Sequence, residues 1–119
     1  MVRNAAFRRV ELAARGDIDG LAGAESAGGW DRARWTEALA AYAAEHGRTG
    51  PDHSAIGTGT DARSGAWFQP TEAPVRWTVR QVIDDPDGNH DWAIVGEIDL
   101  AASDEEGAPV WRTVRFDRP

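Results

Sequence analysis

The stretch 75-VRWTVRQVIDDPDGNHDWAIVGEIDL-100 decides the fold, because its apolar residues recur at every second position. This period is typical of β-strands that bury one face. One face of the first half carries mostly apolar side chains: Val75, Trp77, Val79, Gln81 and Ile83. The matching face of the second half carries Trp92, Ile94, Gly96, Ile98 and Leu100. Between them, DPDG at 85–88 is typical of a tight turn, since proline fits its second position and glycine tolerates a positive φ.

The turn at 85–88 also predicts how the two strands pair, because closing the hairpin there makes Asp84 oppose Asn89. The inward residues are then expected to pair as Ile83 with His90, Gln81 with Trp92, Val79 with Ile94, and Trp77 with Gly96. A slip of one residue would turn one apolar face to water, so the pattern disfavours it. In the predicted register, the smallest residue lies beneath the largest.

The residues before this hairpin have the spacing of helices. Phe7, Val10 and Ala14 share one side of a first helix, which Gly16 is placed to end. Asp17 is a candidate N-cap for a short second helix. The sequence therefore predicts two short helices before residue 24.

A third helix has the clearest helical pattern. Asp31 is a good N-cap, and Trp30 and Trp35 occupy the two positions of a hydrophobic staple. One stripe of this helix carries Trp35, Leu39, Tyr42 and His46. Gly47 is expected to end it.

Two further strands are expected on either side of the hairpin. AWFQ at 66–69 is a short strand candidate, and SDEEG at 103–107 predicts a turn before the last strand. In that last strand Trp111 is expected to cover an edge. The residues expected to face inward are Val110, Val114 and Phe116.

These elements predict a single α+β domain over residues 1–119, with a helical half at 1–47, a loop at 48–64 and antiparallel strands at 65–119. The helices are expected to pack on one face of a curved antiparallel meander and to give it a cone-like shape. The order of elements, together with RGDIDGLAG at 15–23, resembles the nuclear-transport-factor-2-like superfamily. Members of that superfamily range from enzymes to plain scaffolds, so the resemblance implies a fold and not a function.

Composition excludes several classes of function. The chain has no cysteine, which excludes disulfides, thiolate metal sites and a cysteine nucleophile. All 13 basic residues are arginine, so a lysine Schiff base is excluded as well. The net charge of −7 argues against nucleic-acid binding by this domain alone. No apolar run approaches the roughly 20 residues that span a bilayer, and no signal peptide is evident, so we expect a soluble cytoplasmic protein without membrane association.

Four blocks, read in order, resemble the uncharacterised C-terminal domain of actinobacterial DEAD/DEAH-box helicases. They are VRNAAFRRVELAARGD at 2–17, RWTEALAAYAAEHG at 34–47, IGTGTDARS at 56–64 and VRQVIDDPDGNHDWAIVGEIDLAASDEEG at 79–107. The resemblance implies a domain that follows an RNA-helicase-type motor. The chain itself lacks the phosphate loop and the acidic Mg²⁺-binding box of such motors, so no ATP hydrolysis is implied. The family offers no catalytic residues to carry over.

His90 and Asp91 form a candidate polar site at the end of the turn. In a chemical reading, His90 is a general base oriented by a carboxylate. In a structural reading, His90 packs over the hairpin and Asp91 accepts hydrogen bonds from turn amides. Adjacent strand residues point to opposite faces, so the two side chains are not expected to hydrogen-bond each other. The pattern favours turn closure.

Gln81 indicates a candidate pocket, because it is an amide on an otherwise apolar strand face. If Arg112 shares that face, the two side chains could recognise a carboxylate or carbonyl. The full set of candidate pocket residues is Gln81, Trp77, Trp92, Arg112 and Tyr42. The competing interpretation is that Gln81 lies near the sheet edge and bonds a neighbouring backbone group.

The loop before the first strand is a candidate docking surface with Asp61, Arg63 and Trp67. Its GTG has no strand-glycine-helix context, so a phosphate loop is not predicted. His46 and His53 are separated by a helix stop and a proline, so we predict no metal site. Most of the six tryptophans are expected in the core, with Trp67 and Trp111 considered for exposed contacts.

Two classes of function remain. The favoured one is a non-catalytic accessory domain that binds a protein partner or a helicase motor, with a filled interior and an exposed patch near residues 56–68. The alternative is a cone-fold protein that binds a small apolar ligand, or a small hydrolase, isomerase or cyclase, with ionisable groups such as Asp91, Glu97 or Arg112 in its pocket. No cofactor is expected. Dimerisation through the sheet stays an open alternative.

Overall fold

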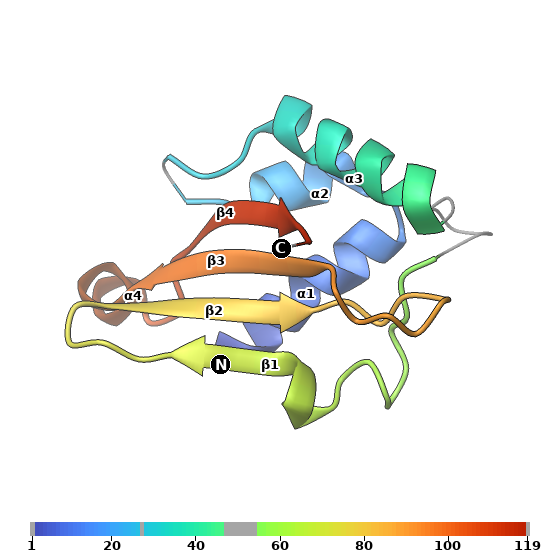
Figure 1. Ribbon diagram of the computed structural model, residues 1–119. Helices are drawn as coiled ribbons and strands as arrows, with labels where there is room; N and C mark the ends of the chain where they lie inside the picture. Colours follow the sequence, from blue (N-terminus) through green and yellow to red (C-terminus); the bar gives the residue numbers. More distant parts are fainter. Residues whose placement is uncertain (1, 27, 47–54, 119) are drawn as a thin grey trace.

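The computed structural model describes residues 2–26, 28–46 and 55–118. The elements, in chain order, are the helices α1 (Val2–Ala14), α2 (Ile18–Gly23) and α3 (Arg32–His46), the 3₁₀ helix η1 (Gly65–Trp67), the strands β1 (Phe68–Thr71), β2 (Arg76–Val82) and β3 (Ala93–Asp99), the helix α4 (Leu100–Glu106) and the strand β4 (Trp111–Asp117). The strands form one antiparallel sheet in the order β1-β2-β3-β4. N-terminal helices followed by this meander confirm the predicted α+β class (Figure 1).

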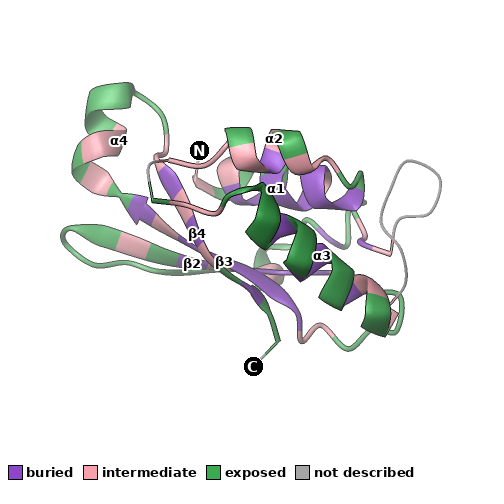
Figure 2. Cartoon of the chain, turned by 90° about the horizontal axis from the view of Figure 1, so that it is seen from above, coloured by how far each residue is buried: buried purple, intermediate pink, exposed green. Residues whose placement is uncertain are grey.

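The helices α1, α2 and α3 cover one side of the sheet, and α4 lies at the end where β3 leads toward β4 (Figure 1). α3 shows an exposed outer side in Figure 2 and buries a stripe that consists of Trp35, Ala38, Leu39 and Tyr42. The core between helices and sheet joins this stripe to α1 and to the inward residues of β2, β3 and β4. Among the described residues, no helix has the length and apolar character that crossing a bilayer requires.

The predicted helix caps are confirmed. Asp17 accepts a hydrogen bond from the amide of Gly20, and Asp31 accepts one from the amide of Arg34, each at 2.9 Å. The rings of Trp30 and Trp35 meet edge to face with centroids 5.1 Å apart, which supports the predicted staple. The expected stop at Gly47 lies outside the described residues.

The predicted hairpin register is wrong by two residues. Gln81 pairs with Ile94, Val79 with Gly96 and Trp77 with Ile98. Because a shift of two preserves the strand faces, the predicted inward face is still the buried one. The strands end at Val82 and Ala93, so Trp92 precedes β3 and the connection is longer than a four-residue turn.

The carboxylate of Asp85 explains this longer connection. It accepts hydrogen bonds from the amides of Asp87 and Asn89, both at 3.0 Å, and from the amide of His90 at 2.7 Å. The predicted turn at 85–88 does form, with the Gly88 amide 3.1 Å from the Asp85 carbonyl and a φ of 71° at Gly88. One buried carboxylate therefore organises the loop and sets where the strands begin to pair.

The connection to the last strand also differs from the prediction. Residues 100–106 form helix α4, which begins with Leu100, instead of a strand end and a turn at 103–107. The carboxylate of Asp99 caps it by accepting a hydrogen bond from the Ala102 amide at 3.0 Å. Val75, expected on the buried face, precedes β2 and is 76% exposed. The strand expected at 66–69 is confirmed for Phe68 and Gln69, which begin β1, whereas Ala66 and Trp67 belong to η1.

Trp111 is a core residue and does not cover an edge. Its side chain is 1% exposed and packs directly on Gly96, while Val110 and Val114 are only half-buried. Phe116 faces inward as predicted, because the β3–β4 register shifts between Val95 and Gly96 and leaves Val114 as the extra residue of β4. The predictions for Trp111, Val110 and Val114 were wrong because α4 changed which residues of β4 face inward, and the bulge changed this again along the strand.

Candidate functional site

Aromatic rings fill the space between the helices and the sheet. The ring of Tyr42 lies 5.2 Å from that of Trp92 and 5.8 Å from that of Phe116, and Phe116 lies 6.1 Å from Trp35. The Tyr42 hydroxyl donates to the carbonyl of Ala55 at 2.7 Å. Burial, together with nearby carboxylates such as that of Asp85, raises the pKa of Tyr42. The structure thus places Tyr42 and Trp92, two candidate pocket residues, inside a packed core.

Gln81 and Arg112 are not brought together. Gln81 is 2% exposed on the inner face, and its amide nitrogen donates to the Val82 carbonyl over 3.4 Å. Arg112 lies between the inward-facing Trp111 and Thr113, and its guanidinium pairs with the Glu97 carboxylate on the outer side of the sheet. Alternation along β4 separates the two candidates onto opposite faces.

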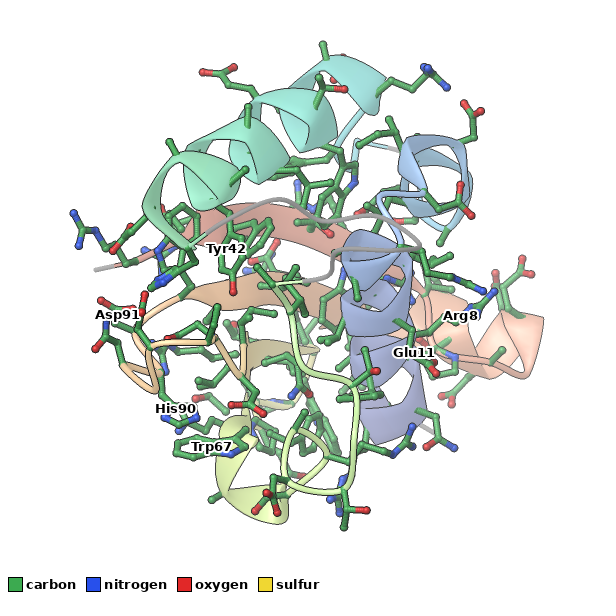
Figure 3. All side chains as sticks on the ribbon, turned by 90° about the vertical axis from the view of Figure 1, so that its right-hand side faces the viewer. Arg8, Glu11, Tyr42, Trp67, His90 and Asp91 are labelled. Atoms are coloured by element: carbon green, nitrogen blue, oxygen red, sulfur yellow. The ribbon has the colours of Figure 1, made fainter. Side chains whose placement is uncertain are left out.

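Asp61 and Trp67 of the candidate docking loop lie at the same surface as His90 of the candidate polar site. The rings of Trp67 and His90 stack with centroids 4.3 Å apart and an interplanar angle of 10° (Figure 3). Beside them lies a depression of about 610 Å³, which we call the Trp67–His90 recess. It is lined by Thr60, Asp61, Ser64, Trp67, Asp84 and His90. Residues far apart in the sequence therefore share one open, polar and aromatic surface.

His90 is held in place by its backbone and by a carboxylate. Its φ of 52° is left-handed, and its Nε2 lies 3.2 Å from the Asp84 carboxylate. The role of accepting turn amides, assigned above to Asp91, belongs to Asp85. Burial raises the pKa of the Asp85 carboxyl, but the backbone hydrogen bonds and His46 outweigh burial, so its pKa is lowered.

Arg63, the remaining residue of the candidate docking loop, faces α1 instead of the recess. Its guanidinium lies over the ring of Phe7, 4.4 Å from the ring centroid. This contact fastens the 56–64 loop to the first helix. Arg63 therefore supports the recess without lining it.

A cluster around His46 was not predicted. The His46 side chain is 1% exposed, and its Nδ1 lies 2.7 Å from an Asp87 carboxylate oxygen. On the other side of the ring, Nε2 lies 3.7 Å from a carboxylate oxygen of Glu45. Two groups that share His46 have the spacing of cation ligands, one with Glu45 and Asp91 and one with Asp85 and Asp87. The partner considered above, His53, lies outside the described residues.

A buried polar network joins α1 to β4. The Arg9 guanidinium lies 4.9 Å from the Trp111 ring centroid, and the Thr113 amide donates to Glu25 at 2.8 Å. Burial lowers the pKa of Arg9 and raises the pKa of Glu25. The Arg9 guanidinium donates to the carbonyls of Ala5 and Ala24, and Glu25 holds Thr113, so these contacts serve the fold.

Comparison with known proteins identifies the family. A family model described as a domain of unknown function (DUF3516) matches residues 1–116, so the chain belongs to this family. No curated protein and no solved structure matches the chain.

Proposed function

We propose that this DUF3516 domain is a non-catalytic accessory domain that binds a DEAD/DEAH-box helicase motor through the Trp67–His90 recess. The observation that carries the proposal is the packed interior. Tyr42, Trp92 and Phe116 occupy the region where the alternative function needs an open chamber. Because the interior is filled, we expect the domain to bind its partner through its surface.

The recess favours an arginine side chain on the motor as the bound group. Asp61 and Asp84 supply carboxylates, and Trp67 supplies an aromatic surface beside them. A guanidinium pairs with carboxylates through its planar fork and stacks on aromatic rings, so one arginine can use both features. The net charge of −7 further favours a basic partner surface.

The helicase as partner rests on the four sequence blocks that resemble the C-terminal domain of actinobacterial helicases. The same resemblance supports a place beside the motor in the cytoplasm. The order of helices and antiparallel strands supports a nuclear-transport-factor-2-like architecture. Neither inference requires a catalytic residue in this chain.

Biolayer interferometry tests the proposal, with the chain immobilised and the purified helicase motor from the same genome in solution. We expect Asp61→Asn and Trp67→Ala each to weaken binding by about tenfold or more, a loss of roughly 1.4 kcal/mol. Asp104→Asn, an exposed carboxylate on α4, is the matched control and should bind like the wild type. Absence of wild-type binding would reject the proposed function. Equal binding by all variants would reject the recess as its surface.

The small-ligand alternative keeps one supporting observation, which is Gln81. Its amide lies among apolar side chains and makes a hydrogen bond of 3.4 Å, near the limit of a useful bond. Tryptophan fluorescence melting against a panel of hydrophobic carboxylates and carbonyl compounds tests this function. A saturable rise in Tm that Gln81→Leu abolishes would favour the ligand-binding function over the accessory one.

A further inference from the structure

We propose that His46, Glu45 and Asp91 form a binding site for a divalent transition-metal cation. His46 and Glu45 come from the C-terminal end of α3, and Asp91 comes from the loop before β3. One ligand atom from each residue lies within 4.8 Å of the other two. The inference is independent of the proposed partner, because the motor plays no part in it.

The buried ring of His46 presents an unsatisfied nitrogen to this site. Its Nδ1 lies 2.7 Å from Asp87, and a carboxylate oxygen accepts hydrogen bonds, so Nδ1 carries the proton. In the neutral ring, Nε2 then offers a lone pair toward the Glu45 oxygen 3.7 Å away, and two acceptors face each other. If Nε2 is protonated instead, it is a buried donor without a hydrogen-bond partner. In either form Nε2 has no hydrogen-bond partner, and a cation on its lone pair would satisfy it.

Asp91 contributes a second polar atom that lacks a hydrogen-bond partner. Its Oδ1 is buried and has no hydrogen-bond partner among the described residues. Figure 3 shows Asp91 on the opposite side of the loop from the stacked His90 and Trp67 rings. Two residues that each carry an unsatisfied buried atom, a nitrogen in His46 and a carboxylate oxygen in Asp91, thus belong to one group with ligand spacing. An acidic cluster alone would not indicate a site, but this pair does.

The surrounding hydrogen bonds orient two of the three ligands. Metal-binding histidines commonly donate their other ring N–H to a carboxylate, and Asp87 occupies that position on His46. The indole N–H of Trp92 donates to one oxygen of Glu45 at 2.8 Å and fixes that carboxylate. The other Glu45 oxygen accepts from the exposed Arg118 at 2.9 Å. The Arg118 guanidinium is therefore a competing cation for the oxygen that faces His46.

The other group around His46 does not carry a site. Both carboxylate oxygens of Asp85 already accept hydrogen bonds from backbone amides, and Nδ1 of His46 is already paired with Asp87. The Asp85 oxygens and Nδ1 of His46, which face one another in this second group, are therefore already satisfied. Cation binding is thereby assigned to the Nε2 side of the ring.

The ligand set indicates the class of metal. One imidazole and two carboxylates suit Zn²⁺, and affinity is expected to follow the order Zn²⁺ above Mn²⁺. Ligand atoms about 2.1 Å from a tetrahedral ion stand roughly 3.4 Å apart, so atoms that now lie within 4.8 Å of one another would approach by at most about 1.4 Å. Three protein ligands leave a position for water.

Isothermal titration of the full chain with ZnCl₂ tests the site. We expect one Zn²⁺ per chain, and loss of more than about 100-fold in affinity in Asp91→Asn, because a direct ligand should matter more than a hydrogen-bonded outer partner. Asp87→Asn removes only that outer partner and should weaken binding by roughly 10- to 100-fold. Arg118→Gln should bind more tightly. His90→Gln, the matched control at the other His–Asp pair, should bind like the wild type.

Long-range ¹H–¹⁵N NMR of the imidazoles gives a second readout that needs no variant. The expected result is a proton on Nδ1 of His46 and a Zn²⁺-dependent shift of its Nε2 signal. The proposal is overturned if Zn²⁺ leaves Nε2 of His46 unchanged. It is equally overturned if Asp91→Asn folds and binds Zn²⁺ as tightly as the wild type.

Discussion

Replacing Gly96 with alanine tests how the sheet accommodates Trp111. A Cβ at position 96 would lie 2.2 Å from Cζ2 and 2.3 Å from Cε2 of the Trp111 indole. Carbon atoms pack favourably at about 3.5–4.0 Å, so the ring or the strand would have to retreat by more than about 1 Å. The indole has little freedom to do so, because its N–H donates to Thr113 at 2.8 Å and Arg9 lies over its face.

The expected destabilisation by Gly96→Ala is about 2–4 kcal/mol. Overpacking a core by one methyl group costs about 1–3 kcal/mol. Losing the hydrogen bond from Trp111 to Thr113 adds about 1 kcal/mol. Urea unfolding followed by far-UV circular dichroism measures the loss as a lower midpoint.

Gly23→Ala is the matched control, since a Cβ there meets nothing within 4 Å at the end of α2. It should leave stability unchanged or raise it by up to about 1 kcal/mol. A double-mutant cycle adds Trp111→Val, which should remove most of the cost of Gly96→Ala. The reasoning is refuted if the free energy of unfolding of Gly96→Ala alone lies within about 0.5 kcal/mol of the wild-type value.

Three further substitutions test other parts of the account. Asp85→Asn replaces one of two buried acceptor oxygens by an NH2 donor, so at least one of the three loop amides loses its acceptor and faces a donor. Chemical unfolding should show a loss of about 2–3 kcal/mol, and a loss below about 0.5 kcal/mol would contradict the role of Asp85 in the loop. Burial raises the pKa of the Glu25 carboxyl, so the folded state favours its protonated form. The free energy of unfolding of the wild type, relative to that of Glu25→Gln, should therefore rise as the pH falls from 7 toward about 4.3. A decrease in this relative stability over the same pH range would contradict the raised pKa. Asp31→Ala removes the N-cap of α3 and should lower stability by about 1 kcal/mol, against no change for the exposed Asp104→Ala.

The local elements were predictable because their causes are local. Helix caps at Asp17 and Asp31 and the two-residue period around the 85–88 turn depend on residues a few positions apart. The pairing register was not predictable from the turn alone, since the amides gathered by Asp85 lengthen the connection. Phe116 was correctly predicted on the inward face of β4, but Trp111 was missed, because the inward positions depend on α4 and on a bulge, which apolar spacing does not encode.

The candidate sites depended on contacts that sequence spacing does not provide. Trp67 and His90 were each selected, but their stacking requires the loop before β1 to return to the 83–92 connection. Arg112 was considered as a partner of Gln81 on the condition that the two share a face, and β4 turns Arg112 outward. The cluster at His46 carried one readable signal, which is a histidine at the end of a buried helical stripe followed by an aspartate-rich turn later in the chain.

The most direct test of the central claim is an NMR titration of the ¹⁵N-labelled chain with the unlabelled helicase motor. The account predicts that the amide signals of Trp67, His90 and Asp61 shift or broaden first. Signals from Arg76 and Thr78 on the opposite face of the sheet should change little. Perturbations confined to that outer face, or none at saturating motor, would contradict the claim that this domain docks its partner through the Trp67–His90 recess.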